Sequence, residues 1–154
     1  TQQIRSLGVK LKHNVNKTLI KNKSLTLIDD SLVRGTTSVK IIKMLHDAGA
    51  KEVHLRIASP PIKYPDYYGV DTPNENELLA SKNNLEEMRK IINAKTLKFL
   101  SIEGLYKAMG YENRNSSYPQ FTDHCFTGDY PIKPLDINDK DSIDNQLSFI
   151  TSKS

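Results

Sequence analysis

The segment Leu27-Ile-Asp-Asp-Ser-Leu-Val-Arg-Gly-Thr-Thr-Ser38 decides the fold of this 154-residue chain. Two adjacent acids, Asp29 and Asp30, end a short apolar run, and Gly35 precedes three hydroxyl residues. The apolar run 25–28 is rich in β-forming residues and is bounded by turn residues and acids, which predicts a buried strand. The segment is therefore expected to join the end of a strand to the start of a helix.

A helix and a second strand are expected directly after Gly35. Apolar residues recur with helical spacing at positions 39, 41, 42, 44, 45 and 48, and the hydroxyls of residues 36–38 supply N-cap chemistry. Gly49 is well placed to end this helix, and the alternating segment 53–58 predicts a strand. Strand, helix and strand in this order form a βαβ unit, whose two strands lie parallel in one sheet.

The rest of the chain predicts more α/β structure between two polar ends. Residues 1–24 are expected to form a lysine-rich loop with one short strand around residues 7–11, and residues 136–154 a polar, disordered tail. Further helices are expected at 77–80, 85–92 and 102–109, a third strand at 97–100, and a proline- and tyrosine-rich connection at 59–75. The fold class is α/β with a parallel sheet.

Positive charge is concentrated in the first part of the chain. Residues 1–63 hold 12 Lys and Arg against 4 Asp and Glu, whereas residues 64–154 hold 10 against 14. A basic half could attract nucleic acid, a membrane surface or a phosphorylated small molecule, and a solvated basic face explains the charge equally well. No apolar run has the length of a membrane span or a secretory signal, and the single cysteine, Cys125, agrees with a reducing compartment. We therefore expect a cytoplasmic protein.

Residues 29–38 have the chemistry of a site for phosphate, sugar and magnesium. Ligands of parallel sheets bind beyond the carboxyl ends of the strands, where helix N-termini offer free N–H groups. The backbone of Arg34 to Ser38 could hold a phosphate, and Asp29 and Asp30 could bind sugar hydroxyls or Mg²⁺. The alternative is that the acids only cap a turn and the hydroxyls only cap the helix. The segment matches neither a Walker P-loop nor the GxGxxG pattern.

The same segment resembles the phosphoribosyl-pyrophosphate (PRPP) binding motif of type I phosphoribosyltransferases. Three further segments, 47–73, 99–105 and 125–131, are together similar to the C-terminal portion of the amidophosphoribosyltransferase family, and the similarity extends over residues 1–135. The resemblance implies the parallel-sheet type I phosphoribosyltransferase fold in incomplete form, with only its C-terminal part present. Residues 1–24 would then be the end of the flexible active-site loop and its lead-in.

The resemblance also implies a reaction and its residues. The family, a group of pentosyltransferases, converts PRPP, glutamine and water into 5-phosphoribosylamine, pyrophosphate and glutamate, at the first committed step of purine synthesis. Its ammonia comes from an upstream glutaminase domain with an N-terminal cysteine nucleophile, which this chain lacks, so the isolated chain is expected to be inactive. The full enzyme is expected to be a homo-oligomer. By carry-over, Asp29 and Asp30 are catalytic and bind Mg²⁺, and the PRPP-binding residues are Asp29, Asp30, Ser31, Arg34, Gly35, Thr36, Thr37 and Ser38.

Some family members carry a structural [4Fe-4S] cluster on four cysteines. The resemblance places three of these positions at Asp66, Thr122 and Cys125. Aspartate and threonine are poor replacements for thiolates, so no cluster is expected and Cys125 is predicted to be a packed thiol. The adjacent His124 suggests a metal pair with Cys125, but no second pair follows nearby in the sequence, which argues against a metal site.

Two other functions share parts of this pattern. Another type I phosphoribosyltransferase, such as a base-salvage or orotate enzyme, would have the acidic pair but not the segments 59–65 and 125–131. A regulatory protein could use the fold to sense PRPP while binding DNA, but no residue run supplies a DNA-reading module such as a helix-turn-helix. We therefore expect neither nucleic acid nor a membrane as a partner.

Overall fold

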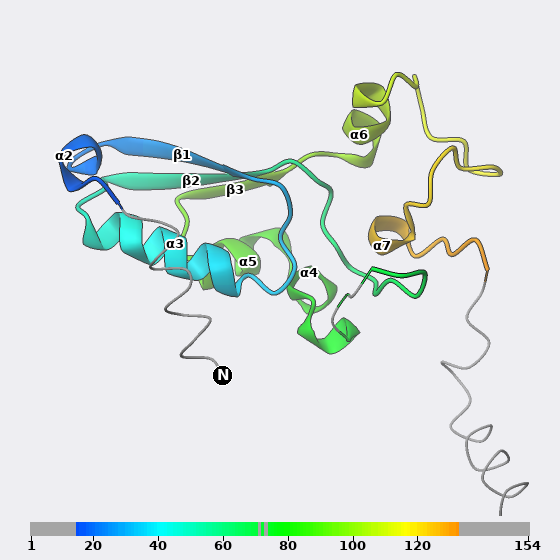
Figure 1. The fold of residues 1–154 in the computed structure, drawn as a ribbon, viewed down its shortest axis with the longest axis horizontal. Coiled ribbons are helices and arrows are strands. Elements are labelled where there is room, and N and C mark those ends of the chain that lie inside the picture. The colour runs from blue at the N-terminus through cyan, green and yellow to red at the C-terminus, as the bar shows by residue number, and fades with distance from the viewer. Residues whose placement is uncertain (1–14, 71, 73, 133–154) are drawn as a thin grey trace, which may run out of the picture.

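A three-stranded parallel sheet organises the fold, and α6 and α7 lie beyond one end of its strands (Figure 1). The structure, a computed structural model, describes residues 15–70, 72 and 74–132. The strands are β1 (Ser24–Asp29), β2 (Glu52–Ile57) and β3 (Thr96–Phe99), in the order β1-β2-β3. Both strand pairs are parallel, as the sequence predicted. The strand expected near residues 7–11 and the tail expected at 136–154 lie outside the described residues.

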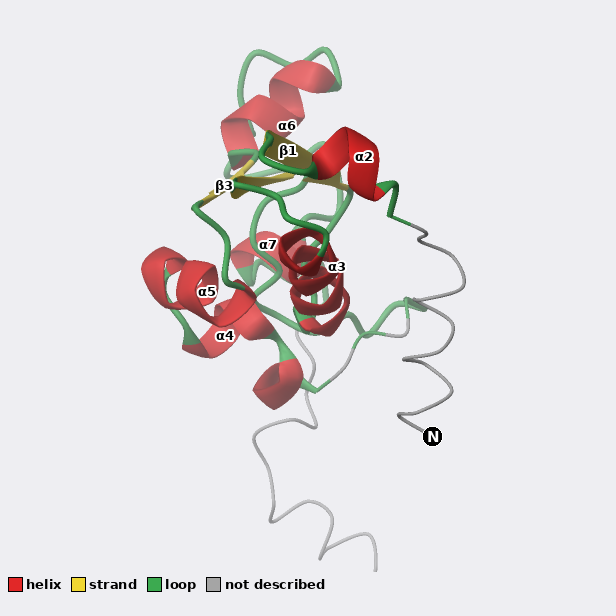
Figure 2. Ribbon diagram, turned by 90° about the vertical axis from the view of Figure 1, so that its left-hand side faces the viewer, coloured by secondary structure: helices red, strands yellow, loops and turns green. Residues whose placement is uncertain are grey.

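Two helices cover one face of the sheet, as Figure 2 shows: α3 (Thr36–Asp47) and α5 (Leu85–Ile92). The short helix α4 (Leu79–Lys82) lies beside α5. Every second residue of β2 is buried, because the strand alternates between the helix-covered face and the opposite face. The core consists of Leu32, Ile42, Val53, Leu55, Ile57, Leu79, Ala80, Met88, Ile92, Ala94 and Leu97.

The helix α5 has the bounds that the sequence predicted because its ends are marked by local chemistry. At its start, the Asn84 side chain accepts the N–H groups of Glu86 and Glu87, and the Glu87 side chain accepts the Asn84 N–H. This reciprocal capping box satisfies donors that a helix otherwise leaves open. Asn93, in the left-handed region with φ 60°, ends the helix.

The remaining elements are short, and sequence patterns predict them less well. The expected helix at 77–80 is instead a 3₁₀ turn, Glu75–Glu77, followed by α4. The helix α6 (Ile102–Ala108) was predicted, whereas α2 (Lys17–Ile20) and α7 (His124–Thr127) were not. Four residues make barely one helical turn, so no apolar period can reveal them. None of the described helices has the length and apolar character that a membrane crossing requires.

The other face of the sheet is polar and partly open. The Thr96 hydroxyl lies 2.9 Å from His54 Nδ1 and accepts a hydrogen bond from Arg56 Nη1 at 2.9 Å. On β1 the side chain of Ile28 is 73% exposed. Within the described residues β1 pairs with β2 alone, so its outer edge carries unpaired backbone groups.

Two neighbouring isoleucines of α5 provide a matched test of this core. Ile92 is fully buried, whereas Ile91 is 49% exposed. We expect Ile92→Ala to lower the free energy of unfolding by about 2–5 kcal/mol, because it leaves a cavity in the core. Ile91→Ala should cost about 1 kcal/mol or less, since that site is half open to water. Urea unfolding followed by circular dichroism measures both, and equal losses would contradict this packing.

Candidate functional site

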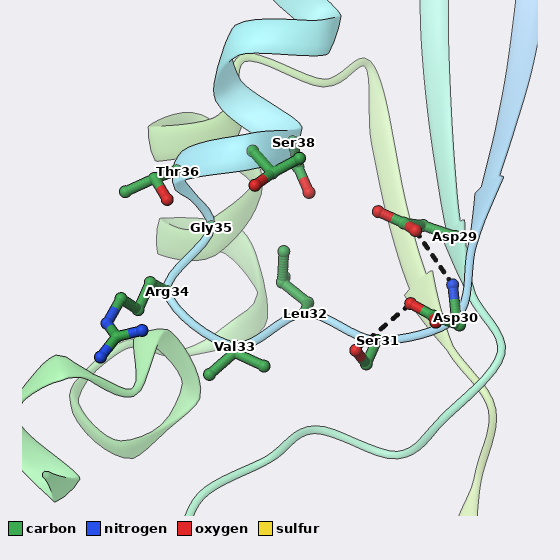
Figure 3. Close-up of a pocket in the computed structure, with 10 residues that line it drawn as sticks. Asp29, Asp30, Ser31, Leu32, Val33, Arg34, Gly35, Thr36 and Ser38 are labelled. Atoms are coloured by element: carbon green, nitrogen blue, oxygen red, sulfur yellow. Dashed lines mark hydrogen bonds between the residues drawn. The ribbon is translucent and has the colours of Figure 1, made fainter. Parts of the chain in front are cut away.

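The loop between β1 and α3 encloses a hollow of about 280 Å³, lined by residues 29–38 (Figure 3). This is the carboxyl end of β1, where parallel sheets bind their ligands. Leu32 is 2% exposed and anchors the middle of the loop in the core. The carbonyl of Val33 accepts a hydrogen bond from the Leu79 N–H at 2.9 Å. The loop is therefore held in place although it contains no helix or strand.

The two predicted acids lie together at one side of the hollow. Asp29 Oδ1 accepts the N–H of Asp30 at 3.1 Å, and the Ser31 hydroxyl lies 3.3 Å from Asp30 Oδ1. Figure 3 shows the Asp29 carboxylate turned across the hollow toward Ser38. Two adjacent carboxylates concentrate negative charge, and their oxygens are the donors that Mg²⁺ prefers.

The opposite side of the hollow is the start of α3. Gly35 is the N-cap residue, in the left-handed conformation with φ 75°, and no side chain caps this helix. The prediction that the hydroxyls of residues 36–38 supply the N-cap is therefore wrong. The helix begins directly after Gly35, so the hydroxyl residues 36–38 lie inside its first turn and not at its N-cap. The N–H groups of that turn have no intrahelical acceptor and favour an anion.

Arg34 contributes to the lining of the hollow, but its guanidinium does not point into it. Its Nε lies 2.7 Å from Glu77 Oε2, and Figure 3 shows its side chain directed away toward the neighbouring turn. Both side chains of this ion pair are about half exposed, so the pair is open to water. Among the predicted PRPP-binding residues, only Arg34 forms an ion pair with a described residue outside the loop.

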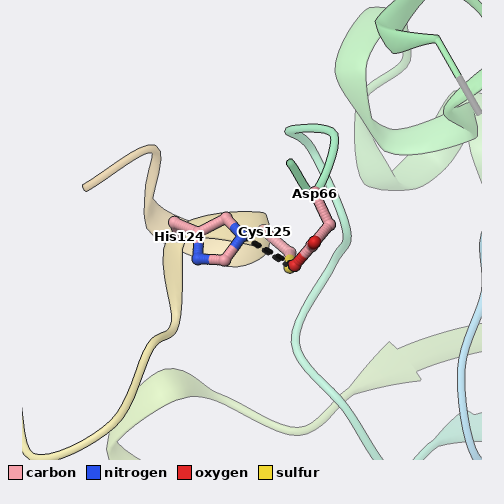
Figure 4. A group of neighbouring side chains, drawn as sticks. All are labelled: Asp66, His124 and Cys125. Atoms are coloured by element: carbon pink, nitrogen blue, oxygen red, sulfur yellow. Dashed lines mark hydrogen bonds and ion pairs between the residues drawn. The ribbon is translucent and has the colours of Figure 1, made fainter. Parts of the chain in front are cut away.

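A second group of side chains comes together away from this loop, as Figure 4 shows. His124 Nε2 lies 2.9 Å from Asp66 Oδ2, and Cys125 Sγ lies 3.7 Å from that nitrogen and 4.0 Å from that oxygen. No second metal-binding pair lies near His124 and Cys125 in the sequence, but the fold brings one further side chain with a metal-binding atom, Asp66, to them from 58 residues away. Thr122, by contrast, is exposed and is not part of this group.

The short helix α7 is fixed by a buried ionic network beside this group. Arg114 donates to Asp123 through Nε at 2.6 Å and Nη2 at 3.0 Å, and the Tyr106 hydroxyl donates to Asp123 Oδ2 at 2.8 Å. Burial opposes ionisation of Asp123, but the hydrogen bonds from Arg114 and Tyr106 hold the pKa of its carboxyl below the usual range. Asp123 immediately precedes α7, so the network orients His124 and Cys125.

The chain is similar along most of its length to curated amidophosphoribosyltransferases. It is 56% identical over 153 residues to the enzyme of Rhizobium etli, and this aligned region covers 99% of this chain and 31% of that protein. It is 47% identical over 133 residues to the Bacillus subtilis enzyme, with coverage of 86% and 28%. No protein-family model matches the chain. The chain thus spans less than a third of the length of these relatives.

Solved structures give the same result. The glutamine PRPP amidotransferase of Bacillus subtilis, in complex with ADP and GMP, aligns with a TM-score of 0.72 at 46% identity, over 85% of this chain and 29% of that one. The parallel sheet with its flanking helices is therefore part of a phosphoribosyltransferase fold. Over the portion that it spans, the chain belongs to the amidophosphoribosyltransferase family, which confirms the resemblance found in the sequence.

Gly35 provides a test of the loop geometry, with Gly110 as its control. Both have positive φ, but a Cβ at Gly35 would lie 2.8 Å from Leu79 Cδ2, whereas a Cβ at Gly110 meets no atom within 4 Å. Each alanine substitution should cost about 1–2 kcal/mol of unfolding free energy for the backbone conformation. Gly35→Ala should cost about 1–3 kcal/mol more because of the clash.

Combining Gly35→Ala with Leu79→Ala should recover much of that extra loss, which a double-mutant cycle of unfolding free energies would measure. Equal losses for Gly35→Ala and Gly110→Ala would show that the loop does not press against Leu79.

Asp123 provides a test at acid pH. Its folded-state pKa is depressed, so its contribution to stability is present above the unfolded value of about 3.9 and is lost as the pH falls through the folded-state value. Asp123→Asn should therefore lower stability at neutral pH by about 3–5 kcal/mol and flatten the dependence of Tm on pH below about pH 4.

The matched control is Asp129→Asn, which removes the exposed partner of Arg114. An exposed ion pair contributes about 0–1 kcal/mol, so this variant should keep most of the stability. If both variants lost the same stability, the buried pair would not be what secures α7.

Proposed function

We propose that this chain carries the ribose-5-phosphate and Mg²⁺ part of the PRPP site of an amidophosphoribosyltransferase. The reaction would be that of the family, from PRPP, glutamine and water to 5-phosphoribosylamine, pyrophosphate and glutamate. The observation that carries the proposal is the hollow at residues 29–38, where an acidic pair faces an uncapped helix start. No other described pocket combines these two features at the carboxyl end of a strand.

The 5′-phosphate of PRPP would lie at the first turn of α3. The N–H groups of residues 36–38 and the positive end of the helix dipole favour a phosphate there. The hydroxyls of Thr36 and Thr37 add donors, and Gly35 lets the ligand approach the backbone closely. Arg34 would exchange Glu77 for the phosphate, which an exposed ion pair allows at little cost. The Ser31 hydroxyl would bind at the sugar side.

Asp29 and Asp30 would bind the ribose hydroxyls and hold Mg²⁺, because their oxygens suit both partners. Mg²⁺ held by these carboxylates would neutralise charge on the departing pyrophosphate. Ammonia would form the new C–N bond at the anomeric carbon as the C–O bond to pyrophosphate breaks, and the nitrogen would then release one proton to water to give the amine. The developing positive charge on the ribose is stabilised by the nearby carboxylates, and the loop holds the sugar in place for the attack.

Further parts of the domain would be needed for catalysis. Strands of parallel sheets are normally buried on both faces, yet Ile28 on β1 is largely exposed and the outer edge of β1 is unpaired within the described residues. This supports a complete enzyme in which upstream strands, the pyrophosphate-binding loop and a glutaminase domain accompany this chain. We also propose that the complete enzyme is a cytoplasmic homo-oligomer and that the isolated chain is inactive.

A [4Fe-4S] cluster is not part of this proposal. Such a cluster needs thiolate ligands, and the positions that the family resemblance assigns to it hold Asp66, Thr122 and Cys125. Of these, Thr122 is exposed and lies outside the group formed by the other two. One thiol cannot hold a four-iron cluster.

The alternatives are another type I phosphoribosyltransferase and a PRPP-sensing regulator. Identity of 44–56% to amidophosphoribosyltransferases supports the amidotransferase over a base-salvage or orotate enzyme. A regulator would bind PRPP without turning it over, so the rate of PRPP consumption distinguishes the two.

The test is the double substitution Asp29→Asn and Asp30→Asn in the complete enzyme. Asparagine has nearly the shape of aspartate, and at position 29 its side-chain oxygen can still accept the backbone N–H of residue 30. The two substitutions remove both negative charges. Ammonia-dependent turnover of PRPP should fall by at least roughly 100-fold, the size of losing an electrostatic stabiliser in an active site. Glutamine hydrolysis should continue, because it occurs in a different domain.

The control removes two exposed acids elsewhere, Asp47→Asn with Glu112→Gln, and should leave PRPP turnover near that of the unchanged enzyme. Unchanged turnover in the Asp29 and Asp30 variant would remove these acids from the mechanism.

A further inference from the structure

Three side chains with different metal-binding atoms meet between the proline-rich loop 59–70 and α7. Asp66 offers a carboxylate, His124 an imidazole and Cys125 a thiol, and one ligand atom from each lies within 4.8 Å of the others. This corner, formed by Asp66, His124 and Cys125, is largely shielded from water, since the side chains of Asp66 and His124 are 7% and 3% exposed. Cys125 is half-buried, which leaves a path to solvent.

The spacing of the three atoms fits a single tetrahedral ion. Zinc binds sulfur at about 2.3 Å, nitrogen at about 2.0–2.1 Å and carboxylate oxygen at about 2.0–2.2 Å, so its ligand atoms are about 3.4–3.6 Å apart. The observed separations are 2.9 Å between nitrogen and oxygen, 3.7 Å between nitrogen and sulfur, and 4.0 Å between oxygen and sulfur. Shifts of about half an ångström would make them equal to the zinc values.

Hydrogen bonds orient the Asp66 carboxylate in this corner, and two neighbouring tyrosine rings pack against the His124 ring. Asp66 Oδ1 accepts the N–H groups of Tyr68 at 2.7 Å and Val70 at 3.2 Å, which leaves Oδ2 facing His124. The His124 ring lies 5.0 Å from the rings of both Tyr68 and Tyr130, edge-on to the first. Hydrogen bonds to a ligating carboxylate are a usual feature of metal sites, because they fix its orientation.

Some polar atoms of the corner have no good hydrogen-bond partner. His124 Nδ1 is buried without a hydrogen-bond partner among the described residues, so the corner provides the only polar contact of this ring. The thiol lies too far from the other two groups for a strong hydrogen bond. Burial, and after it the charges of Asp66 and Asp123, raise the pKa of the Cys125 thiol.

We propose that Asp66 Oδ2, His124 Nε2 and Cys125 Sγ bind a single zinc ion, whose fourth position is open to solvent. On binding, the thiol proton passes to water and a zinc–sulfur bond forms. The carboxylate and the thiolate together balance the two charges of the ion, which compensates their burial. Mixed oxygen, nitrogen and sulfur donors are typical of zinc and unlike the oxygen donors around Asp29 and Asp30.

This site differs from an iron–sulfur cluster in its ligands and its contents. It uses His124, and it needs only one cysteine. Its effect would be to join the loop to α7, where the Cys125 carbonyl already accepts the N–H groups of Lys63 and Tyr64 at 2.9 and 3.1 Å. Zinc would thus reinforce an existing contact between segments that are far apart in the sequence.

The experiment uses the full-length gene product, reduced and stripped of metal with a chelator, and titrates it with Co²⁺ and then Zn²⁺. We expect a cobalt–thiolate charge-transfer band that saturates at one ion per chain and disappears when zinc displaces cobalt. Cys125→Ser should abolish this band. Asp66→Asn and His124→Gln should weaken zinc binding by more than the roughly 10- to 100-fold that loss of an outer-shell partner costs. His46→Gln and Asp47→Asn are matched controls that should leave binding unchanged.

A second measurement on the unaltered protein does not depend on how the variants fold. Iodoacetamide modification of Cys125, followed by mass spectrometry of its peptide, should slow by at least tenfold when zinc is added, and added Mg²⁺ should not slow it (a tenfold change is a difference of about 1.4 kcal/mol). Unslowed modification in the presence of zinc, or an unchanged cobalt band in Cys125→Ser, would overturn the proposal. The Asp29 and Asp30 double variant should bind zinc normally, so failure here and failure at the PRPP site are distinguishable.

Discussion

The close approach of Gly35 to Leu79 is the contact on which the candidate PRPP site depends. The chain leaves β1, anchors Leu32 in the core and then turns into α3 through Gly35, which has φ 75° and where an added Cβ would lie 2.8 Å from Leu79 Cδ2. This turn sets where the first N–H groups of α3 point. It also keeps the Asp29 and Asp30 carboxylates and those N–H groups on opposite sides of one hollow. A binding loop without regular structure is thereby positioned by the core beneath it.

Sequence patterns predicted the parts of the fold that local chemistry determines. The alternation at 53–58 and the apolar run at 25–28 predicted two strands within a residue or two of their observed bounds. The helix at 85–92 was predicted with its observed bounds, and Asn84 and Asn93 cap its two ends. The loop at 29–38 was also found from its own residues, because an acidic pair followed by a glycine and hydroxyls is a contiguous signal. Such features depend on neighbours a few residues away, which the sequence displays directly.

Contacts between distant residues were not predictable in this way. The Arg34 guanidinium pairs with Glu77 instead of pointing into the hollow, and nothing in the residues around either one indicates this pair. Likewise Asp66 reaches His124 only because the loop 59–70 folds back on α7, a helix of one turn that has no apolar period. The sequence near Cys125 holds no second metal-binding pair, and Asp66 lies 58 residues before His124 in the chain.

The two sites differ in the kind of ion that each can hold. The hollow at 29–38 presents carboxylate oxygens with access to water, which suits a cation that keeps part of its hydration shell. The corner at Asp66 is largely shielded from water and includes nitrogen and sulfur, which favour zinc over magnesium by donor type. Magnesium at cellular abundance would therefore not displace zinc from the corner. One ion would act in chemistry at the sheet edge, while the other would hold the segment that follows α6 against the loop 59–70.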